Sequence, residues 1–310
     1  GIIDGPGPFA NQRNVVENLD EGLAEVQAYK DLGYQQIKLY SSIKPEWVKP
    51  MADKAHQLGM RVSGHIPAYM TASQAIDAGY NEIQHMNMLF LNFMSDTIDT
   101  RTPLRFTMVA NHGAKLDLSS SAYLTFVKQL KAHQILIDPT LSIFENMFVA
   151  TKGIPSPTYE MIVDRLPLIN QRSYYKGGLP KPVDGSNRYD LAHERMLDVV
   201  YDLYKKGVAI VPGTDGLPGF LYHRELELFV KAGIPVHEVL KMATINAAEI
   251  TGVAEAYGSI EVGKQADLIL ISGNPLERIS DIRNVLWTTQ GGYMYEAKAL
   301  YASMGIKNFN

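Results

Sequence analysis

Short apolar runs typical of strands alternate along this chain with longer stretches whose apolar spacing is typical of helices. This alternation favours βα units and a parallel sheet, because parallel strands need a helix-sized crossover between them. The predicted strands cover residues 35–40, 61–66, 82–86, 134–139 and 208–213. The predicted helices cover residues 18–32, 45–58, 71–78, 119–133, 190–206, 222–232 and 236–250. The pattern therefore predicts an α/β protein.

Residue types at the helix ends support these boundaries. Pro45 opens one predicted helix and Gly59 follows it, as the preferences of proline for helix starts and of glycine for helix stops require. Asp190 is expected to be the N-cap of the long helix that ends before Gly207.

The number of strands is small for the fold that they suggest. We count five full strands and the tail of a sixth in residues 1–4. A closed β/α barrel needs eight strands, and an open sheet would leave two edges unpaired. We therefore expect a (β/α)8 TIM-like barrel that is incomplete at its N-terminus, with the other strands lost or supplied by another polypeptide.

Two segments depart from the alternation. Residues 140–189 are interrupted by prolines and carry several aromatics, and a connection of this length is uncommon unless it is functional or disordered. A lid over the barrel mouth and a plain insertion both fit this segment. After Tyr257 the sequence changes to short strands and turns. We therefore expect a partial barrel over residues 1–255 and a partial β-sandwich over residues 256–310.

Composition excludes several classes of function. The 310 residues have a net charge of −4 with acids and bases mixed, so we expect no nucleic-acid partner. The absence of cysteine excludes disulfides and thiolate zinc sites, and leaves histidine, carboxylate or modified lysine as metal ligands. The apolar stretch at residues 86–94 is too short to cross a bilayer, so we expect no membrane partner. The compartment stays open between the cytoplasm and the periplasm or export.

Four polar residues each stand at or near the end of a short apolar run that reads as a strand: Lys38, His65, His85 and Asp215. The carboxyl ends of successive parallel strands meet at one rim, which is where the active sites of β/α barrels lie. Taken singly, each residue has an ordinary explanation, such as an exposed lysine or an aspartate in a turn. Their common position at strand ends is what predicts a shared site.

The chemistry of these four residues points to a divalent metal. Two imidazoles and a carboxylate from neighbouring strands can bind a first-row metal ion. The ammonium of Lys38 has no lone pair, so it becomes a ligand only as a carbamate formed with CO2. Two bridged metals would ionise a water and polarise a carbonyl. Asp215 is not needed to hold both metals, so we assign it the proton transfer to a leaving amine.

The chain resembles the amidohydrolase superfamily in its imidazolonepropionase-like and prolidase-like branch. The resemblance covers nearly the whole chain, and its most specific motif ends in Gly-Lys-x-Ala-Asp-Leu. The matching motifs are Ile37-Lys38-Leu39-Tyr40, Gly64-His65-Ile66-Pro67, Ile83-Gln84-His85-Met86, Gly213-Thr214-Asp215-Gly216, Ala243-Thr244-Ile245-Asn246-Ala247-Ala248 and Gly258-Ser259-Ile260-Glu261-Val262-Gly263-Lys264-Gln265-Ala266-Asp267-Leu268.

This resemblance implies a fold and a set of roles. The fold is a distorted β/α barrel of the metal-dependent hydrolase type with a small β-sandwich. A carboxylated Lys38 would bridge two metals, zinc being the expected ion, and His65 and His85 would bind the second of them. Asp215 would be both ligand and proton shuttle. Tyr40 and His223 match positions that contact substrate in some members of the superfamily.

One feature of the superfamily is absent from this sequence. The family places a His-x-His pair at the end of its first barrel strand, and no His-x-His occurs in this chain. By resemblance, the chain corresponds to the C-terminal part of a family member, which agrees with the low strand count. We therefore expect this chain to be inactive by itself, with a homo-oligomer or a complementing N-terminal fragment as the kind of partner that would complete it.

Three classes of function remain open on the sequence. The first is a metal-dependent hydrolase that uses a metal-bound hydroxide to cleave an amide C–N bond in a cyclic amide, a dipeptide or an N-acyl amino acid. The second is a non-catalytic truncated barrel stabilised by self-association or by a partner chain. The third is a lyase or aldolase that uses Lys38 as a Schiff base, against which the neighbouring His65, His85 and Asp215 argue.

Overall fold

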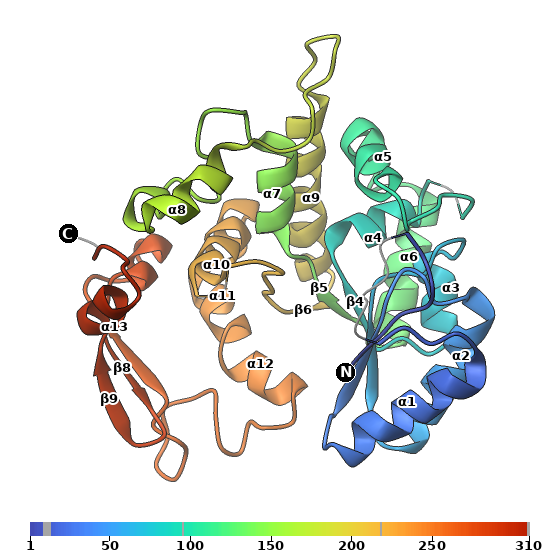
Figure 1. Ribbon diagram of the computed structural model, residues 1–310, viewed down its shortest axis with the longest axis horizontal. Helices are drawn as coiled ribbons and strands as arrows, with labels where there is room; N and C mark the ends of the chain where they lie inside the picture. The colour runs from blue at the N-terminus through green and yellow to red at the C-terminus, as the bar shows by residue number, and fades with distance from the viewer. Residues whose placement is uncertain (9–13, 95, 218, 309–310) are drawn as a thin grey trace. The chain divides into compact units, whose positions relative to one another are not determined.

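The computed structural model in Figure 1 describes residues 1–8, 14–94, 96–217 and 219–308. The chain divides into two compact units. The first unit comprises residues 1–139 and 194–210, and the second comprises residues 140–193 and 211–310.

Parallel strands form the centre of the first unit. Three of them make one sheet in the order β1 (Ile2–Ile3), β2 (Gln36–Leu39) and β3 (Arg61–Gly64). The other three make a second sheet in the order β4 (Glu82–Gln84), β5 (Leu136–Asp138) and β6 (Ala209–Ile210). Strands β3 and β4 also touch, and the Asn81 amide donates to the Val62 carbonyl at 2.9 Å. The α/β class predicted from the sequence is therefore confirmed, whereas the strands described here do not by themselves show a closed barrel.

The helices of this unit follow the strands in sequence, and α1 and α2 pack side by side (Figure 1). Their N-termini are capped locally: Asn18 and Ser120 accept backbone hydrogen bonds, and Thr71 forms a capping box with Gln74. The elements are α1 (Leu19–Asp31), α2 (Pro45–Gln57), α3 (Ala72–Asp77), α4 (Met86–Leu91), α5 (Leu104–His112), η1 (Gly113–Lys115), α6 (Ser121–Ala132) and α9 (Arg188–Lys205), which begins in the second unit.

Successive side chains of β2 point to opposite faces of the sheet, so one face contributes to the hydrophobic core and the other carries Lys38. Ile37 and Leu39 of β2 are fully buried, as is Val62 of β3, and they belong to the hydrophobic core. Lys38 lies between Ile37 and Leu39 and therefore points to the opposite face of the sheet. The polar face of β2 consequently carries the residue that the sequence singles out.

The second unit combines helices with one antiparallel sheet in the order β7 (Leu268–Ile271), β8 (Val285–Gln290) and β9 (Tyr293–Glu296). Residues 140–189 fold into helical segments, and Tyr159, Ile162 and Leu166 from them form a buried cluster with the start of α10. The helical elements are α7 (Leu141–Val149), η2 (Val163–Arg165), α8 (Leu168–Gln171), η3 (Arg172–Tyr175), α10 (Phe220–Ala232), α11 (Val236–Met242), α12 (Ile245–Ile250), η4 (Ile279–Arg283) and α13 (Ala297–Ser303).

A buried ion-pair network joins three elements of the second unit. Arg224 of α10 makes two hydrogen bonds to the Glu145 carboxylate of α7, at 2.6 and 2.8 Å, and one to Glu227 at 3.0 Å. Glu227 in turn accepts two hydrogen bonds from Arg283 of η4. Burial raises the pKa of Glu145, but the bonds and charge of Arg224 outweigh it, so the pKa lies below its usual value.

Several predicted boundaries were wrong. The strand predicted to reach Met86 ends at Gln84, because the His85 backbone, with a φ of +71°, leaves the extended conformation, and Met86 begins α4. The helix predicted at residues 236–250 breaks at Ala243 and Thr244, where the Thr244 backbone leaves the helical region. Asp190 lies in the first turn of α9 and is not the N-cap.

Two further strand predictions were too generous. The strand predicted at residues 208–213 is reduced to β6, because only Ala209 and Ile210 pair with β5. Residues 258–263, where short strands were expected, form turns.

Among the described residues, no helix is both long and apolar enough to cross a membrane. The domain division at residues 255 and 256 stays a prediction.

Candidate functional site

The strand ends of the first unit bring four residues together that the sequence predicted as site residues. The Lys38 Nζ lies 5.5 Å from the centre of the Tyr40 ring. The Tyr40 ring stacks on the His65 ring with their centres 3.9 Å apart. The His65 and His85 rings meet edge to face with centres 4.8 Å apart. Lys38, Tyr40, His65 and His85 thus form one continuous group, which we call the strand-end cluster.

Sheet register explains how this cluster forms. Strands β2 and β3 are parallel, and Lys38 lies opposite Ser63. Side chains alternate between the two faces of a sheet, so two residues further along, Tyr40 and His65 reach the same level on the same face. His85 follows β4, and its backbone amide donates to the Asp138 carbonyl of β5 at 2.8 Å. The backbone pairing of the parallel strands therefore fixes the positions from which the side chains of Tyr40, His65 and His85 extend.

Glycine is required just before His65. Gly64 has a φ of +131°, and a Cβ there would overlap the Leu39 carbonyl oxygen of the neighbouring strand. A residue with a side chain would push β3 away from β2. Gly64 thus permits the close strand approach that brings His65 next to Tyr40.

Backbone strain occurs where three strands end. His85, Thr140 and Asp215 have φ values of +71°, +46° and +44°, in a region that residues other than glycine rarely occupy. These three residues follow β4, β5 and β6 in the chain. Such strain costs about 1–3 kcal/mol per residue and is often retained at functional sites. Thr140 had not been singled out from the sequence.

His65 is held on several sides. Its side chain is buried, with 4% of the residue exposed. The Ser41 hydroxyl lies 3.0 Å from the Nδ1 atom of the ring, and the Tyr80 hydroxyl donates to the His65 carbonyl at 2.7 Å. These contacts fix both the ring and the backbone of His65.

Electrostatics keep both imidazoles of the cluster neutral. Burial lowers the pKa of His65 well below its usual value, and the neighbouring His85, Lys38 and Arg105 disfavour its protonation further. Burial is also the main cause that lowers the pKa of His85 to about 3, with Lys38 and Arg105 adding to it. Each ring therefore keeps a nitrogen lone pair near neutral pH, as a metal ligand must.

The donor set fits a divalent metal in part. Within the described part of the chain, the buried Nε2 atom of His65 has no hydrogen-bond partner, which suits a coordinating nitrogen. In the same part of the chain, no group of three or more His, Asp or Glu side chains converges on one point. Two imidazoles alone leave a metal under-coordinated, so a modified Lys38 or a carboxylate from elsewhere would have to complete the set.

Asp215 and His223 belong to the second unit. Asp215 lies in the turn between β6 and α10. His223 lies in the first turn of α10 and is half-buried; burial and, less strongly, Arg283 lower its pKa to about 4 against the opposing charge of Glu227. The assignment of both residues to the site of Lys38 stays a prediction.

Sequence reasoning missed two polar neighbours of the cluster. Ser41 directly follows Tyr40, so its place just past the end of β2 was a signal that could have been used. Arg105 lies on α5, and its Nη1 atom is 3.4 Å from the Ser41 hydroxyl although 64 residues separate them. No local pattern in the sequence points to that contact.

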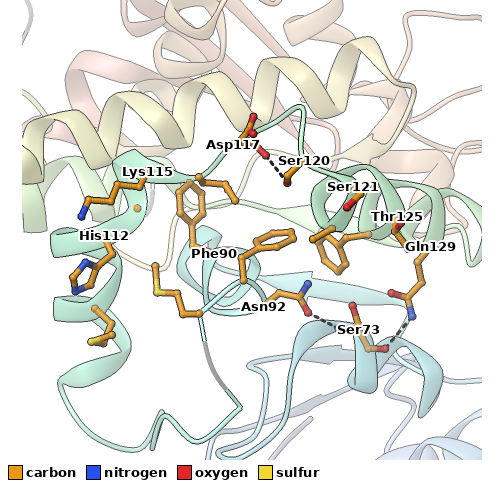
Figure 2. A pocket seen from close by; sticks show the side chains of 17 residues that line it. Ser73, Phe90, Asn92, His112, Lys115, Asp117, Ser120, Ser121, Thr125 and Gln129 are labelled. Carbon is orange, nitrogen blue, oxygen red and sulfur yellow. Dashed lines mark hydrogen bonds between the residues drawn. The ribbon is translucent and has the colours of Figure 1, made fainter.

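A cavity of about 1070 Å³ also lies within the first unit (Figure 2). Residues of α3, α4, α5, η1 and α6 and of the segments between them line it, with apolar side chains such as Phe90 and polar ones such as Lys115 and Asp117. None of the predicted site residues lines this cavity. We therefore base the site on the strand-end cluster.

Comparison with known proteins identifies the family. The sequence model of the amidohydrolase family matches residues 6–291. The chain belongs to the amidohydrolase family. The resemblance read from the motifs is therefore confirmed.

The curated relatives match over short stretches. A 5-methylthioadenosine/S-adenosylhomocysteine deaminase from Teredinibacter turnerae is 39% identical over 87 residues, which are 24% of this chain and 20% of the relative. A probable imidazolonepropionase from Xenopus tropicalis is 34% identical over 82 residues, which are 25% of this chain and 19% of the relative. The matched stretches thus span about a fifth of these relatives.

Solved structures share the fold over most of this chain. A Xaa-Pro dipeptidase with bound methionine has a TM-score of 0.59 at 23% identity, covering 95% of this chain and 62% of the dipeptidase. A bottromycin amidohydrolase has a TM-score of 0.66 at 16% identity, covering 99% of this chain and 67% of its own. At these identities the likeness concerns the fold alone.

Proposed function

We propose that this amidohydrolase-family chain carries most of the active site of a metal-dependent hydrolase that cleaves an amide C–N bond. The substrate is a small molecule: a cyclic amide, a dipeptide or an N-acyl amino acid. Strands β1 to β6 are proposed to be part of a (β/α)8 barrel within residues 1–255, and strands β7 to β9 part of a β-sandwich within residues 256–310. Family membership and the parallel strands of the first unit support this architecture.

The strand-end cluster is the observation that carries the proposal. A lysine, a tyrosine and two neutral imidazoles meet where parallel strands end, and the Nε2 atom of His65 is available as a ligand. Polar groups in this position of an α/β protein serve binding or catalysis in preference to stability. A purely structural role would not require two buried imidazoles in contact with each other, since each imidazole could be replaced by an apolar residue.

Roles follow from the chemistry of each group. His65 and His85 would hold a divalent metal ion, with zinc expected. Lys38, as a carbamate, would be a ligand shared between this ion and a second one. Such a metal lowers the pKa of water and polarises a carbonyl. Asp215 accepts a proton from the attacking water and delivers it to the amine nitrogen as the C–N bond breaks. Tyr40, through its ring beside Lys38 and His65, orients the substrate, and His223 contacts the substrate from α10.

A deaminase is the second candidate, and the names of the relatives favour it. Deaminases of methylthioadenosine and of 5'-deoxyadenosine are among the relatives, at 31–39% identity. Deamination is also a hydrolysis at a trigonal carbon bonded to nitrogen, and it differs by releasing ammonia. Incubation with a panel of dipeptides, N-acyl amino acids and aminopurines would separate the two, since only a deaminase liberates ammonia from the purines.

The test of the proposal is the substitution Lys38→Ala in the full-length protein. We expect it to abolish turnover and the binding of the bridging metal, measured by amide hydrolysis and by elemental analysis. Lys49→Ala is the control, because Lys49 is exposed on α2 and pairs only with Asp53 among the described residues. Full activity of Lys38→Ala with metal bound would refute the assignment.

Two rival outcomes can be recognised in the same experiment. Protein that contains no zinc, has an unmodified Lys38 and shows no turnover would support a non-catalytic truncated barrel held by self-association or a partner. Trapping of Lys38 by borohydride in the presence of a carbonyl substrate would instead reveal a Schiff base.

A further inference from the structure

Arg105 places a guanidinium beside the strand-end cluster. Its Nη1 atom donates to the Ser41 hydroxyl oxygen at 3.4 Å, and the same oxygen lies 3.0 Å from Nδ1 of His65. Ser41 is therefore a common neighbour of this cation and of one imidazole of the cluster. Arg105 itself is half-buried, so its charge is partly withdrawn from water and a ligand can still reach it.

The backbone around Arg105 is held from two sides. The Thr100 hydroxyl, in the connection just before α5, donates to the Ile66 carbonyl at 3.3 Å and ties this connection to the segment after β3. From the other side, the Asn87 side-chain amide of α4 donates to the Arg105 carbonyl at 3.2 Å. Thr100 and Asn87 are both buried. The starting point of the Arg105 side chain is therefore fixed, as precise recognition of a ligand requires.

The place of Arg105 in its helix does not favour stability. Arg105 is the second residue of α5, and the first turn of this helix contains no acidic residue. The N-terminal end of a helix carries a partial positive charge, which disfavours a cation at that end. An anionic partner for Arg105 explains this position better than the helix does.

The hydrogen bonds that Arg105 donates from Nη1 can be improved by an anion. They go to two neutral oxygens, the Ser41 hydroxyl and the Thr100 carbonyl, and both are 3.4 Å long. Hydrogen bonds from a guanidinium to a carboxylate are shorter, about 2.7–2.9 Å, and roughly twice as strong as neutral ones. A carboxylate that enters here would therefore compete well for the guanidinium.

The charges around the cluster also favour an anion. Lys38 and Arg105 are both cationic, and both disfavour protonation of the His65 and His85 rings. A site with charges of one sign attracts a ligand of the other sign. If Lys38 becomes the proposed carbamate, Arg105 keeps its charge, because a guanidinium does not lose its proton in proteins.

The candidate substrates differ in whether they carry a carboxylate. In a dipeptide or an N-acyl amino acid, a single carbon separates the α-carboxylate from the amide nitrogen. A cyclic amide need not have this group, and the aminopurines lack it. A guanidinium can bind a carboxylate through two parallel hydrogen bonds, which fixes its orientation as well as its position. A carboxylate held by Arg105 would thus place the adjacent C–N bond beside the strand-end cluster.

We infer that Arg105 binds the α-carboxylate of the substrate and thereby selects dipeptides and N-acyl amino acids over amides that lack this group. This role rests on the proposed amide hydrolysis and deepens it, because it narrows the substrate class and names the residue that recognises it.

Paired substrates test this role in the full-length protein. Glycyl-leucine and N-acetyl-leucine are each compared with their C-terminal amide, and the release of glycine or acetate is measured. The wild type should hydrolyse the acids with the higher kcat/KM. Arg105→Gln should lower kcat/KM for the acids about 10–100-fold, mainly through KM, because hydrogen bonds to a charged group are lost. It should leave kcat/KM for the amides unchanged.

Two further variants control for charge and for the loss of an arginine. Arg105→Lys keeps the positive charge without the planar fork, so its kcat/KM for the acids should lie between those of the wild type and Arg105→Gln. Arg195→Gln is the matched control, because Arg195 lies on α9 and pairs with Asp198 of the same helix. It should behave as the wild type does with both kinds of substrate.

A binding measurement makes the test independent of turnover. The ¹⁵N NMR signal of the Arg105 Nε–H group should shift when N-acetylglycine is added to the wild type, and should stay in place when N-acetylglycinamide is added. Circular dichroism of Arg105→Gln shows whether the variant is folded. We expect its melting temperature to match that of the wild type, because the substitution removes a cation from the N-terminal end of α5.

The role of Arg105 and the proposed reaction can fail separately. Equal kcat/KM for acids and amides, or an equal loss for both in Arg105→Gln, would overturn the role of Arg105 and leave amide hydrolysis standing. If the wild type hydrolyses no amide but N-acetylglycine shifts the Arg105 signal, the carboxylate site stands and the proposed reaction falls. No turnover together with no shift would overturn both.

Discussion

Removing Arg224 should destabilise the protein more than removing any exposed cation. The Glu145 side chain is 2% exposed, and Arg224 binds it through two hydrogen bonds, at 2.6 and 2.8 Å. In Arg224→Met the carboxylate would stay buried without its counter-charge, although Thr158 still donates one hydrogen bond at 3.0 Å. Breaking a buried pair in this way costs about 3–5 kcal/mol.

The free-energy cost of Arg224→Met should come from Glu145 alone, because the other partner of Arg224 keeps its own hydrogen bonds. Glu227 also binds Arg224, but it keeps two hydrogen bonds from Arg283, at 2.6 and 3.0 Å. The loss therefore comes from one uncompensated carboxylate. It amounts to a large fraction of the 5–15 kcal/mol that typically separates folded from unfolded protein.

Urea unfolding followed by circular dichroism measures this effect. The matched control is Lys241→Met on α11, because the Lys241 side chain is 54% exposed and its pair with Glu238 should contribute less than about 1 kcal/mol. The double variant Arg224→Met with Glu145→Gln removes both charges, so it should be more stable than Arg224→Met alone. The reasoning fails if Arg224→Met loses no more free energy of unfolding than Lys241→Met, or if the double variant is the least stable.

Two further predictions concern pH and glycine. Burial lowers the pKa of His193 to about 4, against the opposing charge of Glu145. Only the unfolded chain takes up this proton as pH falls from about 6.5 to 4, so folded stability is full above that window and about 3 kcal/mol lower below it. His193→Gln should reduce the difference between the unfolding free energies measured at pH 7 and at pH 4 by this amount, while the other buried histidines keep their own contributions. An unchanged pH profile would count against the reasoning. Gly64→Ala should destabilise far more than Gly59→Ala in thermal melts, because a Cβ at Gly64 overlaps Leu39 whereas a Cβ at Gly59 meets open space, and equal melting temperatures would contradict this.

Local signals in the sequence predicted most elements of the first unit. The helix that begins at Pro45 ends at Gln57, one residue before its predicted end. Its bounds were predictable because proline and glycine determine helix starts and stops locally, without help from distant residues. The broken helix at residues 236–250 shows the limit of such signals. No glycine or proline marks the break at Ala243 and Thr244, where the Thr244 backbone leaves the helical region between α11 and α12.

The strand-end cluster was predictable for a different reason. Parallel strands end at one rim whatever the details of packing, so Lys38, His65 and His85 could be placed together from their position at strand ends alone. The stacking of Tyr40 on His65 needed one more fact, the register of β2 against β3, which the sequence does not state. Assigning Asp215 to the same site remains a prediction, because no local pattern connects the turn after β6 to this cluster.

Long-range partners were beyond sequence reasoning, and they decide what the cluster can do. A histidine at a strand end gives no sign that its pKa is lowered, because the lowering comes from burial and from cations such as Arg105, 40 residues from His65 in the chain. The same holds for the φ of +71° at His85, since nothing in the residue type announces a left-handed backbone. The lowered pKa values and the positive φ both depend on contacts that form only in the folded protein. A strand-end histidine becomes a candidate ligand through its surroundings, and Ser41 and Arg105 are the parts of those surroundings that mutation can test.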